Sequence, residues 1–206
     1  LTNNSFISVN SDTTLTYGGV IADGDSTYNF TKTGGGVLFL SGTHTYDGDT
    51  TISAGTIVLT GALNSATDMI ISTGATWDLR VSQVINSLDL DGAISNGGGS
   101  SSLTVTNTSD IGGNITTTGT QTYTDAVTLS ADSTLQTTNA NVLFSSTIDG
   151  NGNGEFLTVT TGSGTVTFND NIGSTIAINK LEVNSSGGVL VNGNITLSDS
   201  GISLGS

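Results

Sequence analysis

The sequence predicts an all-β chain folded as a parallel β-solenoid of about nine to ten coils. Three observations predict it: short runs of strand-forming residues, a corner pattern that recurs at a period of about 20 to 24 residues, and a shortage of helix-compatible charge. Only 10% of the 206 residues are charged, and 29 are Gly. A chain so poor in Lys, Arg and Glu lacks the polar face of a solvated helix.

The first strands are expected between residues 33 and 62, where the pattern is cleanest. Runs of β-branched, aromatic and aliphatic residues lie at Val37–Leu40, Thr50–Ile52 and Thr56–Leu59, and small or polar turn residues flank each run. Further along, apolar and polar residues alternate, which predicts strands with one buried face. These segments are Leu103–Val105, Leu157–Val159, Val166–Phe168, Leu181–Val183 and Ile195–Leu197.

Corners are marked by two apolar residues four positions apart, with Gly, Asp, Asn or another small residue between them. We expect the first apolar residue to end one strand and the second to open the next, both facing inward. The first residues of successive corners from Leu90 onward are 21, 12, 21, 24 and 23 residues apart, so the offset of 12 predicts a corner on a different edge of the cross-section. The corners are Tyr17/Ile21, Leu59/Leu63, Leu90/Ile94, Ile111/Ile115, Tyr123/Val127, Phe144/Ile148, Phe168/Ile172 and Val191/Ile195.

The chain also repeats itself over a longer distance. Gly42–Ala54 aligns without gaps on Gly119–Ala131, with seven of thirteen positions identical. No composition shift divides the chain, so residues 1–206 are expected to form a single continuous solenoid, a fragment of a longer surface protein whose export signal lies outside it. Two segments rich in Gly, Ser and Asn, 95–102 and 149–154, predict protruding loops. At about 4.8 Å per coil the rod would be roughly 45 Å long.

Composition excludes several classes of partner and site. The formal charge is −14 with only three basic residues, Lys32, Arg80 and Lys180, so we expect no binding to nucleic acid. There is no Cys to form a disulfide or a thiolate site. There is also no Pro, which suits a fold whose strands pair on both sides. No apolar run approaches the roughly 20 residues needed to span a bilayer, so no membrane insertion of this segment is expected.

Two pairs of carboxylates are the candidate site residues. Asp47 and Asp49 flank a Gly, and Asp89 and Asp91 flank a Leu. Such pairs on adjacent coils could hold Ca²⁺ or act as acid and base. Catalysis by lyases of this fold also needs a nearby basic residue, and the three available are far apart in the sequence. We therefore expect no catalytic residue and no cofactor, with adventitious Ca²⁺ as the only ion these four carboxylates suggest.

Three other features have structural explanations that we favour. His44 aligns with Gln121 in the internal repeat, which predicts a polar surface position. Trp77 alternates with Leu79, which predicts a core position. Gly201–Gly205 matches the G-x-S-x-G nucleophile motif by letter, but that motif requires a following helix and a His within hydrogen-bond reach.

The segments GGGVLFLSG at 34–42, TYDGDTTI at 45–52 and AGTIVLTG at 54–61 closely resemble the autotransporter-associated β-strand repeat. From about residue 119 onward the chain looks like the looser repeats of filamentous-haemagglutinin-like adhesins. The resemblance implies a right-handed parallel β-helix from the passenger of a type V secreted protein. It also implies an extracellular location at the bacterial surface, associated with the outer membrane.

The function we expect is structural and adhesive, without catalysis. The expected partners are glycans or proteins on host or sister cells, contacted through the loops. An alternative is a self-assembling surface filament or layer, because the open ends of a solenoid invite end-to-end association. A third is a polysaccharide-degrading β-helix enzyme that uses the paired carboxylates.

Overall fold

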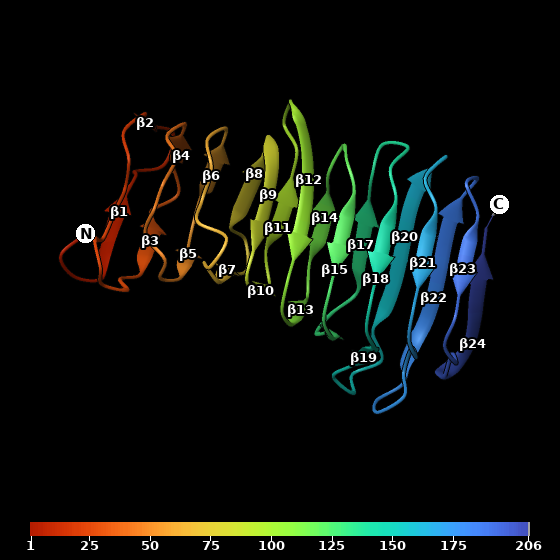
Figure 1. Ribbon diagram of the computed structural model, residues 1–206. Coiled ribbons are helices and arrows are strands. Elements are labelled where there is room, and N and C mark those ends of the chain that lie inside the picture. The colour runs from red at the N-terminus through yellow and green to blue at the C-terminus, as the bar shows by residue number, and fades with distance from the viewer. Residues whose placement is uncertain (206) are drawn as a thin grey trace.

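The computed structural model describes residues 1–205, which form 24 β-strands and no helix. Every strand pairing is parallel, and the chain winds into a rod with its two termini at opposite ends (Figure 1). Three sheets run along the rod, with eight, ten and six strands. The predicted parallel β-solenoid is confirmed, with about nine turns.

The strands alternate among the three sheets in chain order. Sheet 1 contains β1 (Ser5–Ser8), β3 (Phe30–Thr33), β5 (Thr50–Ile52), β7 (Met69–Ile71), β10 (Leu88–Leu90), β13 (Ser109–Ile111), β16 (Val127–Leu129) and β19 (Ile148–Gly150). Sheet 2 contains β2 (Thr14–Tyr17), β4 (Val37–Leu40), β6 (Thr56–Leu59), β8 (Thr76–Leu79), β11 (Ala93–Ser95), β14 (Asn114–Thr116), β17 (Ser133–Gln136), β20 (Phe156–Gly162), β22 (Ile178–Ser185) and β24 (Leu197–Leu204). Sheet 3 contains β9 (Val81–Ile85), β12 (Ser100–Val105), β15 (Gln121–Tyr123), β18 (Val142–Phe144), β21 (Val166–Phe168) and β23 (Val189–Val191).

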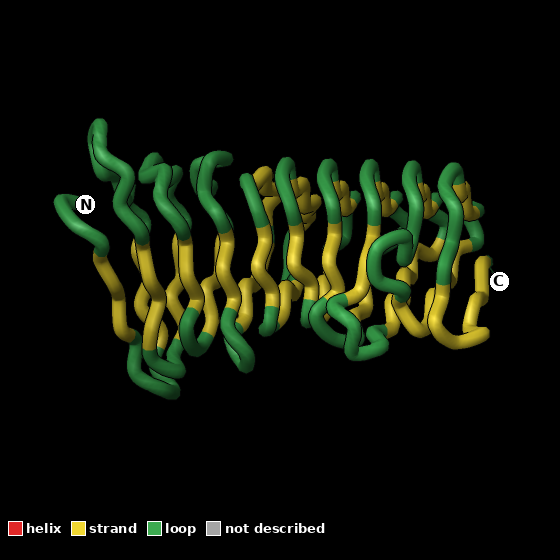
Figure 2. Tube along the Cα trace, turned by 90° about the horizontal axis from the view of Figure 1, so that it is seen from below, coloured by secondary structure: helices red, strands yellow, loops and turns green. Residues whose placement is uncertain are grey.

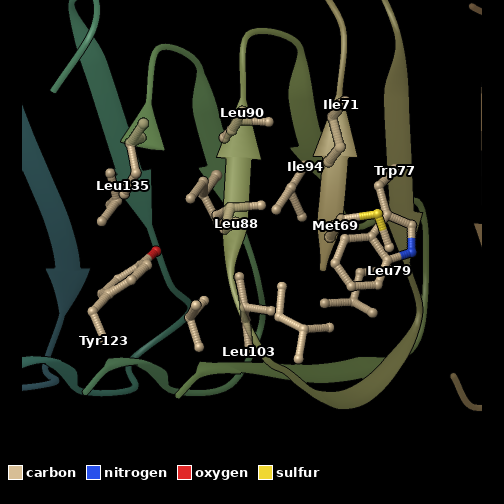
Figure 3. Packing of buried hydrophobic residues seen from close by; sticks show 14 of the residues in the cluster. Met69, Ile71, Trp77, Leu79, Leu88, Leu90, Ile94, Leu103, Tyr123 and Leu135 are labelled. Atoms are coloured by element: carbon tan, nitrogen blue, oxygen red, sulfur yellow. The ribbon is translucent and has the colours of Figure 1, made fainter. Parts of the chain in front are cut away.

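The register stacks like on like along the rod. Because side chains alternate between the two faces of a strand, a fixed register keeps every inward residue above another inward residue. The central inward row of sheet 2 shows this, and its members from Leu38 to Val183 are buried. The row is Leu15, Leu38, Ile57, Trp77, Ile94, Ile115, Leu135, Val159, Val183 and Leu204. Figure 3 shows residues of this row and of sheet 1 pointing into one shared core.

The sequence-predicted strands agree with the structure except Ile195–Leu197, where Ile195 forms only an isolated bridge and β24 begins at Leu197. The predicted corners are also present, but Ile21, Leu63, Ile172 and Ile195 do not open the strands expected of them, because the coil is irregular or only bridged at these positions. The three runs between residues 33 and 62 are β4, β5 and β6 with the expected bounds. Leu90 and Ile94 join sheet 1 to sheet 2, whereas Tyr123 and Val127 join sheet 3 to sheet 1, so the 12-residue offset does mark a different edge. Tyr17 was expected to face inward but is 36% exposed, because no coil covers it in the structure.

The third side of the solenoid changes along the rod. Sheet 3 begins only at β9, so the coils before Val81 have two strands and an irregular third side. That side is formed by segments 18–28, 41–49 and 60–68, where one isolated bridge joins Thr43 to Ala62. Figure 2 shows these N-terminal coils with long loop sections (green). We call residues 1–80 the two-sheet region and residues 81–205, where sheet 3 is present, the three-sheet region. Beyond Gly150, within the described residues, sheet 1 continues only as the isolated bridges Ile148–Ile172 and Ile172–Ile195.

The residue at the end of the sheet 2 strands also changes along the rod. In the two-sheet region it is an apolar core residue, Leu40, Leu59 or Leu79. From β14 to β22, a buried hydroxyl at or next to the end of the strand donates to a carbonyl two or three residues later. The four bonds are Thr117 Oγ1 to Gly119 O, Thr137 Oγ1 to Ala140 O, Thr161 Oγ1 to Gly164 O and Ser185 Oγ to Gly188 O.

Strands take up part of both segments predicted to protrude. In 95–102, Ser95 ends β11 and β12 starts at Ser100, which leaves 96–99 as the connection. Gly97 N donates to Asp78 Oδ1 at 2.7 Å, so this connection lies against sheet 2. In 149–154, β19 continues to Gly150, and the exposed connection begins at Asn151.

Candidate functional site

Asp47 and Asp49 lie at the corner that leads into β5, where they join neighbouring coils. Asp49 N donates to Asn29 Oδ1 at 3.0 Å, and Asn29 Nδ2 donates to Asp49 Oδ2 at 3.1 Å. Burial, and then the charge of Asp68, raises the pKa of Asp49. Asp47 is exposed, and its backbone N–H donates to Asp23 Oδ2 at 3.4 Å. This geometry holds the corner in place.

Asp89 and Asp91 lie on another coil. Asp89 is in β10 and faces outward directly opposite Asp110 of β13. Burial first, and then the charges of Asp91 and Asp110, raises the pKa of Asp89. Strand β7 separates β5 from β10 in sheet 1, so the structure does not bring the two predicted pairs together. Across residues 1–205, no group of three acidic or His side chains is placed to hold a metal ion.

The three basic side chains are engaged elsewhere. Lys32 is buried in the inward row of sheet 1, and its Nζ donates to three carbonyls, Thr33 O at 2.8 Å, Gly34 O at 2.6 Å and Ala54 O at 3.1 Å. Burial lowers the pKa of the Lys32 ammonium. Arg80 pairs with Asp78 and Lys180 pairs with Glu182, each at 2.7 Å. Neither ion pair involves a candidate carboxylate.

The surface position predicted for His44 is wrong. His44 is 2% exposed, and its Nδ1 accepts a hydrogen bond from Ile21 N at 3.1 Å. Its ring stacks on Tyr17 with centroids 6.4 Å apart, and burial lowers its pKa. Gln121, its partner in the internal repeat, is equally buried. The missed signal was the two-residue spacing of His44 from Tyr46, because residues two apart on an extended chain face the same way.

Gln83, one corner further along, also hydrogen-bonds to the backbone of the preceding coil. No sequence pattern indicated this role. Leu63 N donates to Gln83 Oε1 at 3.1 Å, and Gln83 Nε2 donates back to Leu63 O at 2.9 Å. Buried amide and imidazole groups thus satisfy backbone groups of the preceding coil where no strand ladder exists. These side chains bind the coils together and are shielded from any ligand.

Trp77 and the Gly201–Gly205 segment have structural roles. Trp77 is fully buried in the central row of sheet 2, which confirms the core prediction (Figure 3). Ile202 and Ser203 lie within β24, which continues to Leu204, so this segment is a strand rather than a strand-to-helix turn. The letter match to the nucleophile motif therefore has no structural counterpart.

Two open depressions occur on the surface. One, of about 270 Å³, lies beside the first coil and is lined by residues that include Phe6, Tyr17 and Val20. The other, of about 420 Å³, is lined by Ser130, Ala131, Asp132, Asn153, Gly154 and Glu155. Glu155 is buried there and accepts hydrogen bonds from Asn153 N at 2.9 Å and Asn151 N at 3.3 Å, so it shapes the 151–154 connection.

Comparison with known proteins finds a family match for one part of the chain. The family model described as passenger-associated-transport-repeat matches residues 30–67, which span β3 to β6 and the irregular third side that follows them. Neither a curated protein nor a solved structure matches the chain. Residues 1–205 contain no helix with the length and apolar character needed to cross a membrane. The matched repeat implies a secreted or cell-surface passenger. Residues 30–67 are therefore similar to a passenger-associated transport repeat, and this match and the β-solenoid around it fit an autotransporter passenger repeat.

Proposed function

We propose that this chain is a structural and adhesive segment, without catalysis, of a bacterial surface passenger displayed outside the outer membrane. The observation that carries the proposal is that the matched repeat, residues 30–67, is continuous with the rest of the rod. The same register passes through it in sheets 1 and 2, from β1 to β19 and from β2 to β24. A continuous, regularly hydrogen-bonded rod suits a spacer that holds contact surfaces away from the cell.

The placement of the ionisable groups supports the absence of catalysis. The two carboxylate pairs lie on different coils, and no basic side chain faces either pair. His44 is buried and its Nδ1 already accepts a backbone hydrogen bond. A general base must reach its substrate proton within hydrogen-bond distance, directly or through one water. The buried His44 lacks that access, and the exposed Asp47, Asp89 and Asp91 have no basic partner beside them among residues 1–205.

Adhesion would use the exposed parts of the coils. The connections 96–99 and 151–154 carry Asn and Gly with exposed backbone, which suits hydrogen bonding to glycans or proteins of host or sister cells. Adventitious Ca²⁺ at the four candidate aspartates would not create a separate adhesive site. Two-partner secretion of a filamentous-haemagglutinin-like protein is the alternative export route.

Display on intact cells tests the proposal. The 206-residue chain is placed between an export signal and an outer-membrane translocator, with an epitope inserted at Gly152. We expect antibody access on intact cells and more binding to a host or sister-cell layer than the translocator alone gives. An epitope reached only after permeabilisation would contradict surface display. Unchanged cell binding would contradict the adhesive role.

A glycan panel tests the enzymatic alternative. We expect the purified chain to release no product from acidic or neutral polysaccharides. Turnover that is lost in Asp47→Asn or Asp89→Asn would overturn the proposed absence of catalysis. Turnover that both substitutions leave unchanged would overturn it as well and would locate the activity elsewhere.

End-to-end assembly is a second candidate, and the first and last coils favour it. Leu15 is 42% and Tyr17 is 36% exposed, although both belong to inward rows. At the other end Ile202 is 48% and Leu204 is 42% exposed, although their neighbours Leu181 and Val183 are fully buried. Regular fibres of the purified chain in electron microscopy would support this candidate, and dispersed rods would exclude it.

A further inference from the structure

Sheet 3 differs from the other two sheets in charge. None of its six strands, β9, β12, β15, β18, β21 and β23, contains an acidic or basic residue. By contrast, Asp89, Asp110 and Asp149 face outward in sheet 1, and sheet 2 carries the Lys180–Glu182 pair. Among the residues that the structure describes, sheet 3 is thus the one sheet whose strands all lack charge, in a chain of net charge −14. We call the outward side of these six strands the neutral face.

A single row of uncharged side chains runs along the middle of the neutral face. Val84 is 42% and Leu190 is 50% exposed at its two ends, and Leu143 is partly exposed between them. Thr fills the other positions, so the row presents methyl and hydroxyl groups only. In order along the rod the row is Val84, Thr104, Thr122, Leu143, Thr167 and Leu190.

We propose that the neutral face binds a second copy of this chain. Two molecules of charge −14 repel each other wherever acidic surfaces meet, and the cores of protein interfaces are depleted of charge. Sheet 3 lets two copies approach with apolar and hydroxyl groups facing each other. A flat site for glycans normally offers aromatic rings, whereas Tyr123, Phe144 and Phe168 of this sheet all point into the core. The proposal is independent of the proposed function.

The central row is self-complementary when two rods lie antiparallel. A two-fold axis that runs between the rods, along the strand direction at the middle of the sheet, places the first strand opposite the last. Val84 then meets Leu190 of the second copy, and Thr104 meets Thr167 of the second copy. Near the axis, Thr122 meets Leu143 of the second copy. The two most exposed apolar side chains of the sheet therefore cover each other. A parallel arrangement would place Val84 opposite itself.

The area of the neutral face determines how tightly the two copies are expected to bind. Six strands about 4.8 Å apart, three to six residues long at 3.3 Å per residue, give roughly 350–400 Å² per copy. A standard interface buries about 800 Å² per partner, and interfaces below this size are weak or transient. We therefore expect a dimer that forms only at high protein concentration. In sedimentation, the average mass should rise from 20.7 kDa toward twice that value as concentration increases.

Cross-linking with engineered cysteines tests the arrangement, because the natural chain has no Cys. Val84→Cys and Leu190→Cys chains, distinguished by a tag on one of them, are treated with a short bismaleimide alone and as a mixture. The mixture should give a mixed dimer. Each variant alone should give little, because like positions lie about 24 Å apart across the antiparallel pair. Thr134→Cys, an outward position on sheet 2, sets the background.

Charge substitutions give a second measurement. Leu190→Asp and Val84→Lys alter exposed side chains, so both variants should fold and sediment as monomers. Mixing them should restore dimers, because one Asp–Lys pair and one Val–Leu pair then form. Thr134→Asp, which adds the same charge as Leu190→Asp on sheet 2, should dimerise like the natural chain. A mixture that cross-links no better than Thr134→Cys, or Val84→Cys chains that cross-link mainly to themselves, would overturn the proposal. Dimers that persist in Leu190→Asp would also overturn it.

Discussion

The two-sheet and three-sheet regions close the same solenoid by different means. In the two-sheet region, side chains bridge the third side: His44 accepts a hydrogen bond from Ile21 N, and Gln83 of the following strand β9 exchanges two hydrogen bonds with Leu63. After Val81 a regular ladder of six strands does this work. Backbone polar groups must be paired in both cases, by neighbouring backbone or by buried side chains. The comparison shows that the coil period is compatible with either solution.

The corner after each sheet 2 strand explains part of this difference. Leu40, Leu59 and Leu79 extend the apolar core up to the corner. From Thr117 onward a buried hydroxyl occupies the corner and donates to a nearby carbonyl, which closes the bend within a few residues. The sheet 3 strands β9 and β12 start without such a hydroxyl, after Leu79 and Asn96. A local hydrogen bond thus precedes the later strands of sheet 3, from β15 to β23.

Aromatic packing on the third side differs in the same way. In the three-sheet region Tyr123, Phe144 and Phe168 stack nearly face to face, with centroids 5.1 and 5.2 Å apart. In the two-sheet region Tyr46 is tilted by 50° or more against Phe30 of sheet 1 and against His44, at 5.8 and 6.5 Å, and only Tyr17 stacks on His44. A regular register aligns identical ring positions, whereas the irregular third side does not.

The largest expected effect comes from breaking the aromatic stack. Phe144→Ala removes a fully buried ring that contacts Tyr123 and Phe168, and it should cost about 3–5 kcal/mol of unfolding free energy. Denaturant unfolding at neutral pH measures the loss. Leu143→Ala, the outward neighbour, is the control and should change the free energy by less than about 1 kcal/mol. Equal losses in the two variants would contradict the packing described for sheet 3.

Removing a corner hydroxyl should have the next largest effect. Thr137→Val keeps the shape of the side chain but leaves Ala140 O without its hydrogen bond, at a cost of about 1–3 kcal/mol. The exposed neighbour Thr138→Val serves as the matched control and should be nearly neutral. If thermal unfolding shows the two variants to be equally stable, the hydroxyl does not support the corner.

His44 should give the two-sheet region a pH dependence. Its folded pKa lies below the unfolded value of about 6.5, so the unfolded chain binds the proton more tightly. Stability is therefore fully present above pH 6.5 and falls as the pH drops from there toward the folded pKa. His44→Gln should still accept a hydrogen bond from Ile21 N, as Gln83 accepts one from Leu63 N. It should lose the pH-dependent part of the stability that the imidazole gives.

The measurement compares unfolding free energies of the natural chain and His44→Gln at pH 7.5 and pH 5.5. Because both proteins carry the same carboxylates, the difference between their slopes isolates the imidazole. We expect a smaller loss between these pH values in His44→Gln. Identical slopes would show that His44 is not held neutral in the folded chain.

The smallest effect is expected on the outward row of sheet 1. This row changes from Thr51 and Ile70 to Asp89 and Asp110 near the boundary between the regions. Asp89→Asn should remove the repulsion from Asp110 and raise stability at pH 7 by about 0.2–0.5 kcal/mol, a small value because the side chain is exposed. The gain should vanish as the pH falls through the raised pKa of Asp89. Thr128→Asn is the control, and a gain of the same size there would show that charge is not the cause.

Much of the fold could be predicted from the sequence because strands and corners are local. The bounds of β4, β5 and β6 follow from runs of strand formers between turn residues. The third side could not be predicted in this way. Gly42–Ala54 and Gly119–Ala131 share seven of thirteen residues, yet only the second contains a sheet 3 strand, β15. A strand requires partners on neighbouring coils, here β12 and β18, and a local pattern does not contain that information.

The candidate site shows the same limit. Asp47 and Asp49 were recognisable as a pair, but their distance from Asp89 and Asp91 depends on which coil each occupies. The burial of His44 was missed because a polar residue was assumed to face solvent. In this fold a polar residue faces inward where an unpaired backbone group needs it. Only the coil-to-coil register shows where those backbone groups lie.

Amide hydrogen exchange tests the central claim most directly, namely that the regular third-side ladder begins at β9. We predict slow exchange throughout the third side of the three-sheet region, at residues 103–105, 121–123 and 142–144. In segments 18–28, 41–49 and 60–68 we predict slow exchange only at scattered amides such as His44, Thr45 and Leu63, which donate across coils. Continuous protection across 41–49 equal to that of 121–123 would contradict the division into two regions.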